Sequence, residues 1–423
     1  MKKAAKFFPR RYFMVIGTFL LSLLLYIDRV CISVAKDPIS EELMLSDKQM
    51  GWVLSVFALG YALCQTPSGI LADKYGPRKI LSAIVVVWSI FTAFTGAVWN
   101  FVSLLVVRFL FGAGEAGAFP SISRASYSWI PMSERGIVTG INFSGSRLGA
   151  AFSLPFVAWL LQGFGWRSTF YILGAVGLIW AVLWYLFFRD TPESHPSLNQ
   201  EEVDFIQKNR QQKSKVKNIE KLDFSKLLKS KNMRYAMGQY FCSNFTFFFA
   251  LTWLYPHIKS KYGLEGLETG MYAAIPLIFG AFGNWFSGYL SDKIYKKGNW
   301  RKSRTFPASI GFFLAAIGLL SSIYMDTVTG AILCLSVAIF GADMTLPPSW
   351  SFCIDIGEKH AGTVSGTMNM AGNVGAFITA LLFPYIKVWT GSVESFFYVG
   401  AVLNLMAIFF WSKMRPKKSY KLF

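Results

Sequence analysis

The chain has 423 residues, of which 53% are hydrophobic, 17% aromatic and only 15% charged, and its formal net charge is +19. A water-soluble domain of this size does not bury so much apolar surface, so the composition excludes an ordinary soluble globular protein. The five cysteines form no C-x-x-C pair, and there are only three histidines. We therefore expect free thiols, no metal site and no cofactor.

Apolar runs of about 20 residues, separated by short polar breaks, recur along the whole chain and have the length that a membrane-spanning helix needs. The first run is itself of spanning length and is followed by eleven more, so we interpret it as a span and not as a cleavable signal. The predicted fold class is an all-α integral membrane protein with twelve transmembrane helices. The predicted spans are 12–34, 49–71, 80–98, 102–122, 136–161, 168–188, 235–257, 269–290, 306–324, 328–350, 362–386 and 394–413.

Basic residues gather in alternate connections between these spans. One side carries "MKKAAKFFPRR", "DKYGPRK", "SDKIYKKGNWRKSR", "KMRPKKSYK" and a long connector, whereas the other side has only scattered charges. By the positive-inside rule, this asymmetry predicts a multi-pass protein of the inner (plasma) membrane with both termini in the cytoplasm. The excess charge then marks topology, with attraction to membrane lipid as a secondary effect. Nucleic acid is not an expected partner.

The polar segment 189–234 divides the spans six and six. We predict an N-terminal bundle over 1–188, a cytoplasmic linker over 189–234 and a C-terminal bundle over 235–423. The two halves also resemble each other: "GIVTGINFSGSRLGA" from Gly136 recurs as "GTVSGTMNMAGNVGA" from Gly362, and "GILADKYG" from Gly69 recurs as "GYLSDKIY" from Gly288. Parallel repeats of six helices with a substrate site between them are typical of secondary transporters, so the two bundles are expected to be pseudo-symmetric.

The segment "GILADKYGPRK" lies between the second and third predicted spans. It resembles the loop between helices 2 and 3 of the major facilitator superfamily, and the twelve-span plan agrees with that fold. The resemblance implies that Asp73, Arg78 and Lys79 form a cytoplasmic gating cluster. Asp73 could cap a neighbouring helix or pair with a cation in one conformation and release it in the other. The alternative is an ordinary solvated turn with topogenic charge.

Four charged residues inside apolar spans stand out, because each costs roughly 2.5–3.5 kcal/mol there unless it is paired or functional. Asp28 and Arg29 are adjacent in the first span, so they diverge by about 100° around the helix and cannot face the same neighbour. Arg108 and Glu115, in the fourth span, share one helix face. Asp28 and Arg108 have similar depths, which suggests an ion pair between them that leaves Arg29 free for substrate. A purely structural ion-pair network is the alternative.

Further motifs narrow the resemblance. "YIDR", "RFLFGAGEAGAFPS", "WRSTFYILGAVG", "RDTPESHP" and "GTMNMAGNVGAF" together are similar to the anion:cation symporter family, which includes bacterial carriers of hexuronates, aldonates and aldarates and animal carriers of sialic acid and phosphate. The resemblance implies that Arg29 contacts a substrate carboxylate. It also implies that Asp28 and Glu115 carry the coupling proton, with Arg108 tuning them.

Other polar residues are candidates for the substrate cavity. Tyr61 resembles a family position that reaches the substrate, although a core tyrosine is the alternative. Asn369 and Asn373 lie one helical turn apart, as two amides that bind hydroxyl groups would. Interhelical hydrogen bonding is their alternative role. Arg147, which the repeat places at the position of Asn373, is a candidate gate or second anion anchor. Weaker cavity candidates are Asn244, Ser349 and Trp350, and the sequence indicates no partner for Asp343.

These observations predict a monomeric, proton-coupled symporter of an organic anion, such as a hexuronate, aldonate or aldarate, that works by alternating access. A sodium-coupled or exchange carrier of another organic anion or phosphate remains an alternative within the same fold. A membrane sensor that binds its ligand without moving it is an alternative of another class. The sequence lacks a nucleophile and base pair, a metal cluster and a phosphate-binding loop, so we do not expect an enzyme.

Overall fold

The computed structural model describes residues 9–211, 224–264 and 266–415, and within these ranges all regular secondary structure is helical. The middle of the predicted linker, 212–223, and the basic tail from 416 lie outside the described residues. The N-terminal part contains α1 (Arg11–Val34), α2 (Lys36–Glu42), α3 (Asp47–Tyr75), α4 (Pro77–Thr95), α5 (Phe101–Glu115), α6 (Ala118–Trp129) and α7 (Arg135–Phe187). The connector contains η1 (Pro192–Ser194), α8 (Gln200–Asn209) and α9 (Phe224–Lys229). The C-terminal part contains α10 (Lys231–Thr252), α11 (Leu254–Tyr262), α12 (Gly266–Lys296), α13 (Trp300–Ile323), α14 (Val328–Met344), α15 (Leu346–Gly357), η2 (Glu358–His360), α16 (Ala361–Thr390) and α17 (Glu394–Lys413).

The described residues make twelve passes, in agreement with the predicted fold class. The passes are α1, α3, α4, α5 with α6, the two segments of α7, α10, α12, α13, α14 with α15, α16 and α17. On length and hydropathy alone, eight helical segments of the described part are able to span a membrane. The passes α10 and α12 and the first segment of α7 are not among these segments.

Local sequence sets where several helices start and turn. Ser46 and Gln49 form a reciprocal capping box that starts α3, and Asn100 does the same with Ser103 at the start of α5. The predicted fifth and sixth spans lie in one long α7 that reverses at Gly165, whose φ of 74° is a left-handed conformation that glycine adopts without strain.

The tenth pass is interrupted, as the prolines in "TLPPSW" lead one to expect. Helix α14 ends at Met344 and α15 starts at Leu346, with Pro347 and Pro348 in its first turn. Proline lacks the amide hydrogen that would continue the ladder of the preceding helix, so the break falls immediately before the pair. The break places the last turn of α14 and the first turns of α15 beside the space between the bundles.

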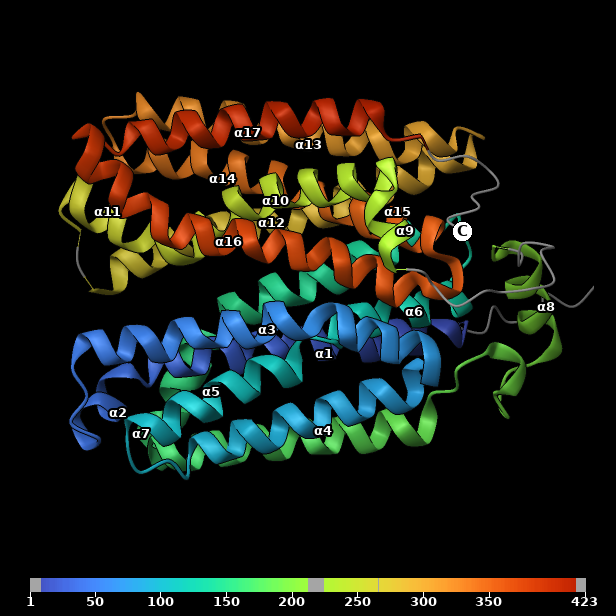
Figure 1. The fold of residues 1–423 in the computed structure, drawn as a ribbon, viewed down its shortest axis with the longest axis horizontal. Coiled ribbons are helices and arrows are strands. Elements are labelled where there is room, and N and C mark those ends of the chain that lie inside the picture. The colour runs from blue at the N-terminus through green and yellow to red at the C-terminus, as the bar shows by residue number, and fades with distance from the viewer. Residues whose placement is uncertain (1–8, 212–223, 265, 416–423) are drawn as a thin grey trace, which may run out of the picture.

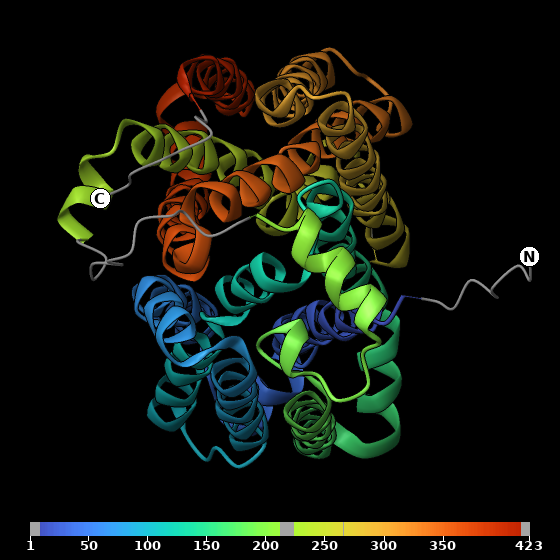
Figure 2. The same ribbon diagram turned by 90° about the vertical axis from the view of Figure 1, so that its right-hand side faces the viewer.

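Figure 1 shows the two bundles lying one above the other, with α1–α7 below and α10–α17 above. We call the end that carries Arg11, Lys413 and α8 the linker end, and the end that carries α2 and α11 the opposite end. Figure 2, viewed from the linker end, shows the two bundles related as two similar halves. The long helices run approximately along the long axis of the molecule in Figure 1.

Glycines bring the two bundles into close backbone contact at the linker end. The close backbone approach joins α3 to α16 at Gly69 and Gly362, and joins α7 to α12 at Gly136 and Gly288. A methyl group at Gly288 would lie 2.6 Å from the carbonyl oxygen of Gly136. These four glycines are the repeat positions read from the sequence, so the internal repeat marks two of the places where helices of opposite bundles meet.

Candidate functional site

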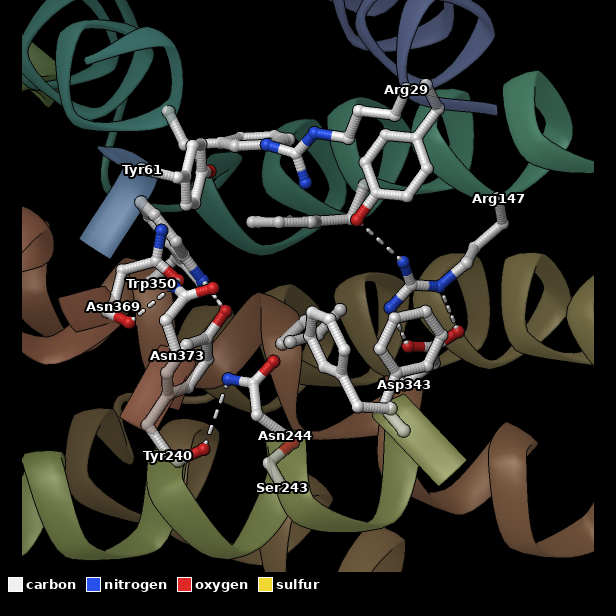
Figure 3. A pocket seen from close by; sticks show the side chains of 16 residues that line it. Arg29, Tyr61, Arg147, Tyr240, Ser243, Asn244, Asp343, Trp350, Asn369 and Asn373 are labelled. Carbon is white, nitrogen blue, oxygen red and sulfur yellow. Dashed lines mark hydrogen bonds and ion pairs between the residues drawn. The ribbon is translucent and has the colours of Figure 1, made fainter. Parts of the chain in front are cut away.

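A cavity with an empty volume of about 460 Å³ lies between the two bundles. Its wall is built by α1, α3, α6 and α7 from one bundle and by α10, α14, α15 and α16 from the other (Figure 3). Its lining residues are Tyr26, Arg29, Tyr61, Phe119, Phe143, Arg147, Tyr240, Ser243, Asn244, Phe247, Phe248, Asp343, Leu346, Trp350, Asn369 and Asn373. All five predicted substrate residues, Arg29, Tyr61, Arg147, Asn369 and Asn373, are therefore brought together on one cavity.

Arg29 is held by an acidic partner. Its Nε lies 2.7 Å from Oε2 of Glu115, whose side chain is fully buried, whereas the Arg29 side chain keeps 16% of its surface exposed. The guanidinium carbon of Arg29 lies 4.4 Å from the ring centroid of Tyr61 and 5.0 Å from that of Tyr26. The aromatic faces and the carboxylate thus orient the guanidinium at the cavity wall. The expectation that Arg29 is unpaired was wrong.

The predicted Asp28–Arg108 ion pair does not form in this structure. Both carboxylate oxygens of Asp28 are buried without a hydrogen-bond partner, and so is Nε of Arg108. The guanidinium of Arg108 instead lies over the ring of Phe111, 4.6 Å from its centroid. The similar depths of Asp28 and Arg108 indicated only their positions along the membrane normal. The rotation of each helix decided that Glu115, at the end of α5, faces Arg29.

Asp343, for which the sequence indicated no partner, pairs with Arg147. Nε and Nη2 of Arg147 donate to the two carboxylate oxygens of Asp343 at 2.7 Å and 2.6 Å, and both side chains are almost completely buried. The guanidinium also stacks on Phe247, 3.5 Å from its centroid, and its Nη1 donates to the hydroxyl of Tyr26. Because Arg147 belongs to α7 and Asp343 to α14, this bidentate pair joins the two bundles at the cavity.

Amide and hydroxyl groups line the C-terminal side of the cavity, opposite Arg29 and Arg147 in Figure 3. Asn373 donates to the backbone oxygen of Asn369 at 2.8 Å, which leaves its side-chain oxygen for a guest. Asn244 donates to the backbone oxygen of Tyr240 at 3.2 Å. Of the weaker candidates, Asn244 and Trp350 line the cavity. Ser349 is not a lining residue, and its hydroxyl bonds the backbone oxygen of Thr345 and the side-chain oxygen of Gln239.

An aromatic cluster lines the cavity on the side of the linker end. Phe119 and Phe143 stack with centroids 4.8 Å apart, and Trp350 of the other bundle lies 5.1 Å from Phe143. At 1.5 Å per residue, these side chains belong to positions about 10–15 Å from the linker ends of their helices. Arg147 lies about 18 Å in, on the other side of the cluster. Sequence reasoning missed this cluster because apolar rings occur throughout the chain, and only the tertiary structure distinguishes those that cross the interface.

Two acidic residues cap helices of the opposite bundle at the linker end. Asp73 accepts the backbone amides of Gly362 and Thr363, at 2.9 Å and 2.7 Å, and the hydroxyl of Thr363 at 2.6 Å. Asp292, its counterpart in the repeat, accepts the backbone amides of Gly136 and Ile137 at 2.9 Å and 2.8 Å. A carboxylate at a helix N-terminus is stabilised by these orphan amides and by the helix dipole. The internal symmetry therefore produces two equivalent ties between the bundles.

The other two members of the predicted gating cluster lie differently. The backbone amide of Arg78 donates to Asp190 at 2.7 Å, and its side chain packs over Tyr185 and donates to the Tyr185 backbone oxygen. These contacts stay within the N-terminal part of the chain. Lys79 is exposed. Only Asp73 of the three thus reaches the other bundle in this conformation.

A buried ion network adds a third tie at the linker end. Asp355 of α15 contacts Arg135 of α7 at 2.5 Å and Arg304 of α13 at 3.0 Å, and none of the three side chains is exposed. Gln211, at the end of the first described part of the linker, donates to the backbone oxygen of Asp355. Sequence reasoning did not single out these residues, because each lies near the end of a predicted span where charge is common.

The described residues contain no group of three or more His, Cys, Asp or Glu side chains arranged to hold a metal ion. All five cysteines are free. The cavity itself offers two guanidinium groups, each on a carboxylate, together with amides, hydroxyls and aromatic faces. Guanidinium groups donate charge-assisted hydrogen bonds to anions, and amides and hydroxyls exchange hydrogen bonds with hydroxyl groups.

Comparison with known proteins agrees with this architecture. The family model described as Major Facilitator Superfamily matches residues 18–380. The chain is 35% identical to the probable sulfoacetate transporter of Cupriavidus necator, over 93% of this chain and 92% of that protein, and 30% identical to the hexuronate transporter of Bacillus subtilis over the same shares. Its fold is similar to the crystal structure of the proton:xylose symporter XylE, with a TM-score of 0.77 and 14% identity over 96% of each chain. This chain therefore belongs to the major facilitator superfamily and is a multi-pass membrane transporter, not an enzyme.

Proposed function

We propose that this protein is a proton-driven symporter of a small organic anion such as a sugar acid, and that it works by alternating access. It acts as a monomer in the inner (plasma) membrane with the linker end in the cytoplasm. The observation that carries the proposal is the contact between Arg29 and Glu115 at the cavity wall, 2.7 Å between Nε and Oε2.

The contact links anion binding to proton binding. A substrate carboxylate and the carboxylate of Glu115 compete for the same guanidinium, because each satisfies it best through charge-assisted hydrogen bonds. When the substrate takes Arg29, Glu115 is left in a fully buried place where an unpaired charge is costly, so it takes up a proton. Asp28, buried without a hydrogen-bond partner directly beside Arg29 in the chain, is the second proton carrier. Arg108 adjusts the charge balance of the two acids.

Alternating access follows from the contacts at the linker end. In the conformation described here, the aromatic cluster of Phe119, Phe143 and Trp350 and the helix caps of Asp73 and Asp292 hold the bundles together on that side of the cavity. Release into the cytoplasm requires these contacts to separate while the opposite ends close. This is a rocking motion of two rigid bundles around a fixed site.

The relatives support the substrate class. One relative is named for hexuronate and another for sulfoacetate, and both molecules are small organic anions. The guanidinium groups of this cavity suit the acidic part of such a molecule, and Asn369 and Asn373 suit its hydroxyl groups. Sodium in place of protons is the alternative driving ion, and the same assay separates the two.

The test is uptake into proteoliposomes of purified protein, with labelled glucuronate, galactonate, galactarate and sulfoacetate as probes. An inside-alkaline pH gradient should drive accumulation of at least one probe, a protonophore should abolish it, and a sodium gradient alone should have no effect. Accumulation that follows sodium and ignores the pH gradient would refute proton coupling. Binding of a probe without counterflow would refute transport and favour the sensor.

A pair of variants locates the coupling site. Glu115→Gln keeps the side-chain shape but cannot cycle a proton, so it should retain substrate exchange and lose uphill accumulation. The matched control is Glu42→Gln, because Glu42 also pairs with an arginine, Arg167, but at the exposed opposite end. Normal accumulation by Glu115→Gln would remove Glu115 from the coupling mechanism.

A further inference from the structure

Two guanidinium groups reach the same cavity from the same bundle. The carbon at the centre of each lies near the ring of Tyr26, 5.0 Å from its centroid for Arg29 and 6.0 Å for Arg147. At most about 11 Å, the sum of these two distances, therefore separates the two guanidinium carbons. A short chain with an acidic group at each end spans this interval.

Each guanidinium already has one carboxylate, Glu115 for Arg29 and Asp343 for Arg147. Both pairs are electrically neutral, so a guest anion enters by replacing one of these carboxylates. Arg29 gives Glu115 one hydrogen bond, whereas Arg147 gives Asp343 two. An anion with a single acidic group therefore binds at Arg29 and leaves the stronger, bidentate Arg147–Asp343 pair intact.

The two pairs differ in what they join. Arg29 and Glu115 belong to the same bundle, whereas Arg147 of α7 and Asp343 of α14 belong to different bundles. An acidic group that takes over Arg147 frees Asp343 and removes a tie between the bundles at the level of the cavity. The Asp343 carboxylate packs against Gly280, because a methyl group at position 280 would collide with it. The Arg147–Asp343 pair is thus built as a close inter-bundle contact.

We propose that the cavity selects anions with two acidic groups, one bound by Arg29 and the other by Arg147, and that Asp343 is the partner that the second acidic group displaces. The inference rests on the proposed transport function and specifies its substrate class: short dicarboxylates or sulfonate–carboxylates. When the second acidic group displaces Asp343, the Arg147–Asp343 contact between the bundles is lost, and the bundles can then move relative to each other in the transport step. Asn369, Asn373 and Asn244 then contact the polar middle of the molecule.

Binding titrations with matched probes test the assignment. Trp350 lines the cavity, so occupancy should change the tryptophan fluorescence of the purified protein in detergent. The probes are galactarate with galactonate, and sulfoacetate with acetate; the members of each pair differ in the second acidic group. For at least one pair, the wild-type protein should bind the doubly acidic probe at least about tenfold more tightly. Equal affinity within both pairs would overturn the proposal.

Arg147→Gln should weaken the doubly acidic probe more than its singly acidic partner, so that the preference for two acidic groups is lost. Arg29→Gln should weaken both members of the pair. Arg167→Gln is the matched control, since Arg167 also pairs with a carboxylate but lies at the opposite end, and it should change neither. An equal loss for both probes in Arg147→Gln would show a merely structural role and overturn the assignment.

Removal of Arg147 alone leaves Asp343 buried without its partner, which endangers folding. The double variant Arg147→Gln/Asp343→Asn removes both charges and keeps hydrogen-bonding groups at both positions. It should lose the preference for two acidic groups as the single variant does, and a retained preference would overturn the proposal. Failure of the wild-type protein to accumulate any probe in proteoliposomes would refute the transport function itself, which is a different result from a lost preference.

Discussion

Asp73→Asn tests whether the helix cap at the linker end holds the bundles together. The carboxylate accepts three hydrogen bonds from the first residues of α16, at 2.6–2.9 Å, and its side chain is 5% exposed. Hydrogen bonds to a charged group contribute roughly 1.5–3 kcal/mol each, and asparagine keeps one accepting oxygen without the charge. We expect the substitution to destabilise the closed linker end by about 2–3 kcal/mol. The ratio of open to closed molecules should then rise about 30- to 150-fold.

The assay is a distance measurement between spin labels at Lys79 and Lys302, which are exposed at the linker ends of the two bundles, in a background without the native cysteines. The population with the longer distance should increase in Asp73→Asn. Asp190→Asn is the matched control, because Asp190 also caps a helix through a backbone amide, that of Arg78, but within one bundle. An unchanged distance distribution in Asp73→Asn, or an equal change in both variants, would refute the reasoning.

Three further outcomes follow from the packing and the charges. Asp355→Asn leaves Arg135 buried without its ion-pair partner and should reduce the free energy of unfolding by about 3–5 kcal/mol. The measurement is the Tm of the purified protein, which should fall. An unchanged Tm would show that the ion network does not stabilise the fold. Gly288→Ala should prevent closure of the linker end in the same spin-label assay. Gly51→Ala, where a methyl group would meet nothing within 4 Å, should behave as wild type. Equal behaviour of the two variants would show that close backbone approach at Gly288 is not required for closure. Hydrogen bonds from neighbouring Trp and Arg side chains lower the pKa of Glu42, so its contribution to stability exists above its ordinary pKa and disappears as the pH falls through the lowered value. The Tm difference between wild type and Glu42→Gln should accordingly vanish in acid, and a difference that persists there would contradict this linkage.

The sequence by itself determined the fold class and much of the cavity wall. Apolar runs of spanning length determine twelve passes because the bilayer permits few other structures. The repeated glycine motifs predict two similar halves, and Gly69, Gly136, Gly288 and Gly362 prove to be points of close backbone contact between them. Polar residues inside spans favour the protein interior, and Arg29, Tyr61, Arg147, Asn369 and Asn373 all line the cavity.

Only the tertiary structure decided which charges meet. Depth along a helix follows from residue number, but the direction of a side chain around the helix axis relative to its neighbours depends on packing. For this reason Arg29 pairs with Glu115, and Asp28 does not pair with Arg108. The partner of Asp343 lies 196 positions away in the other bundle, a separation that no local pattern encodes. Pairing across the bundles is therefore a property of their docking, and it turned two isolated charges, Arg147 and Asp343, into the contact on which the proposed selectivity depends.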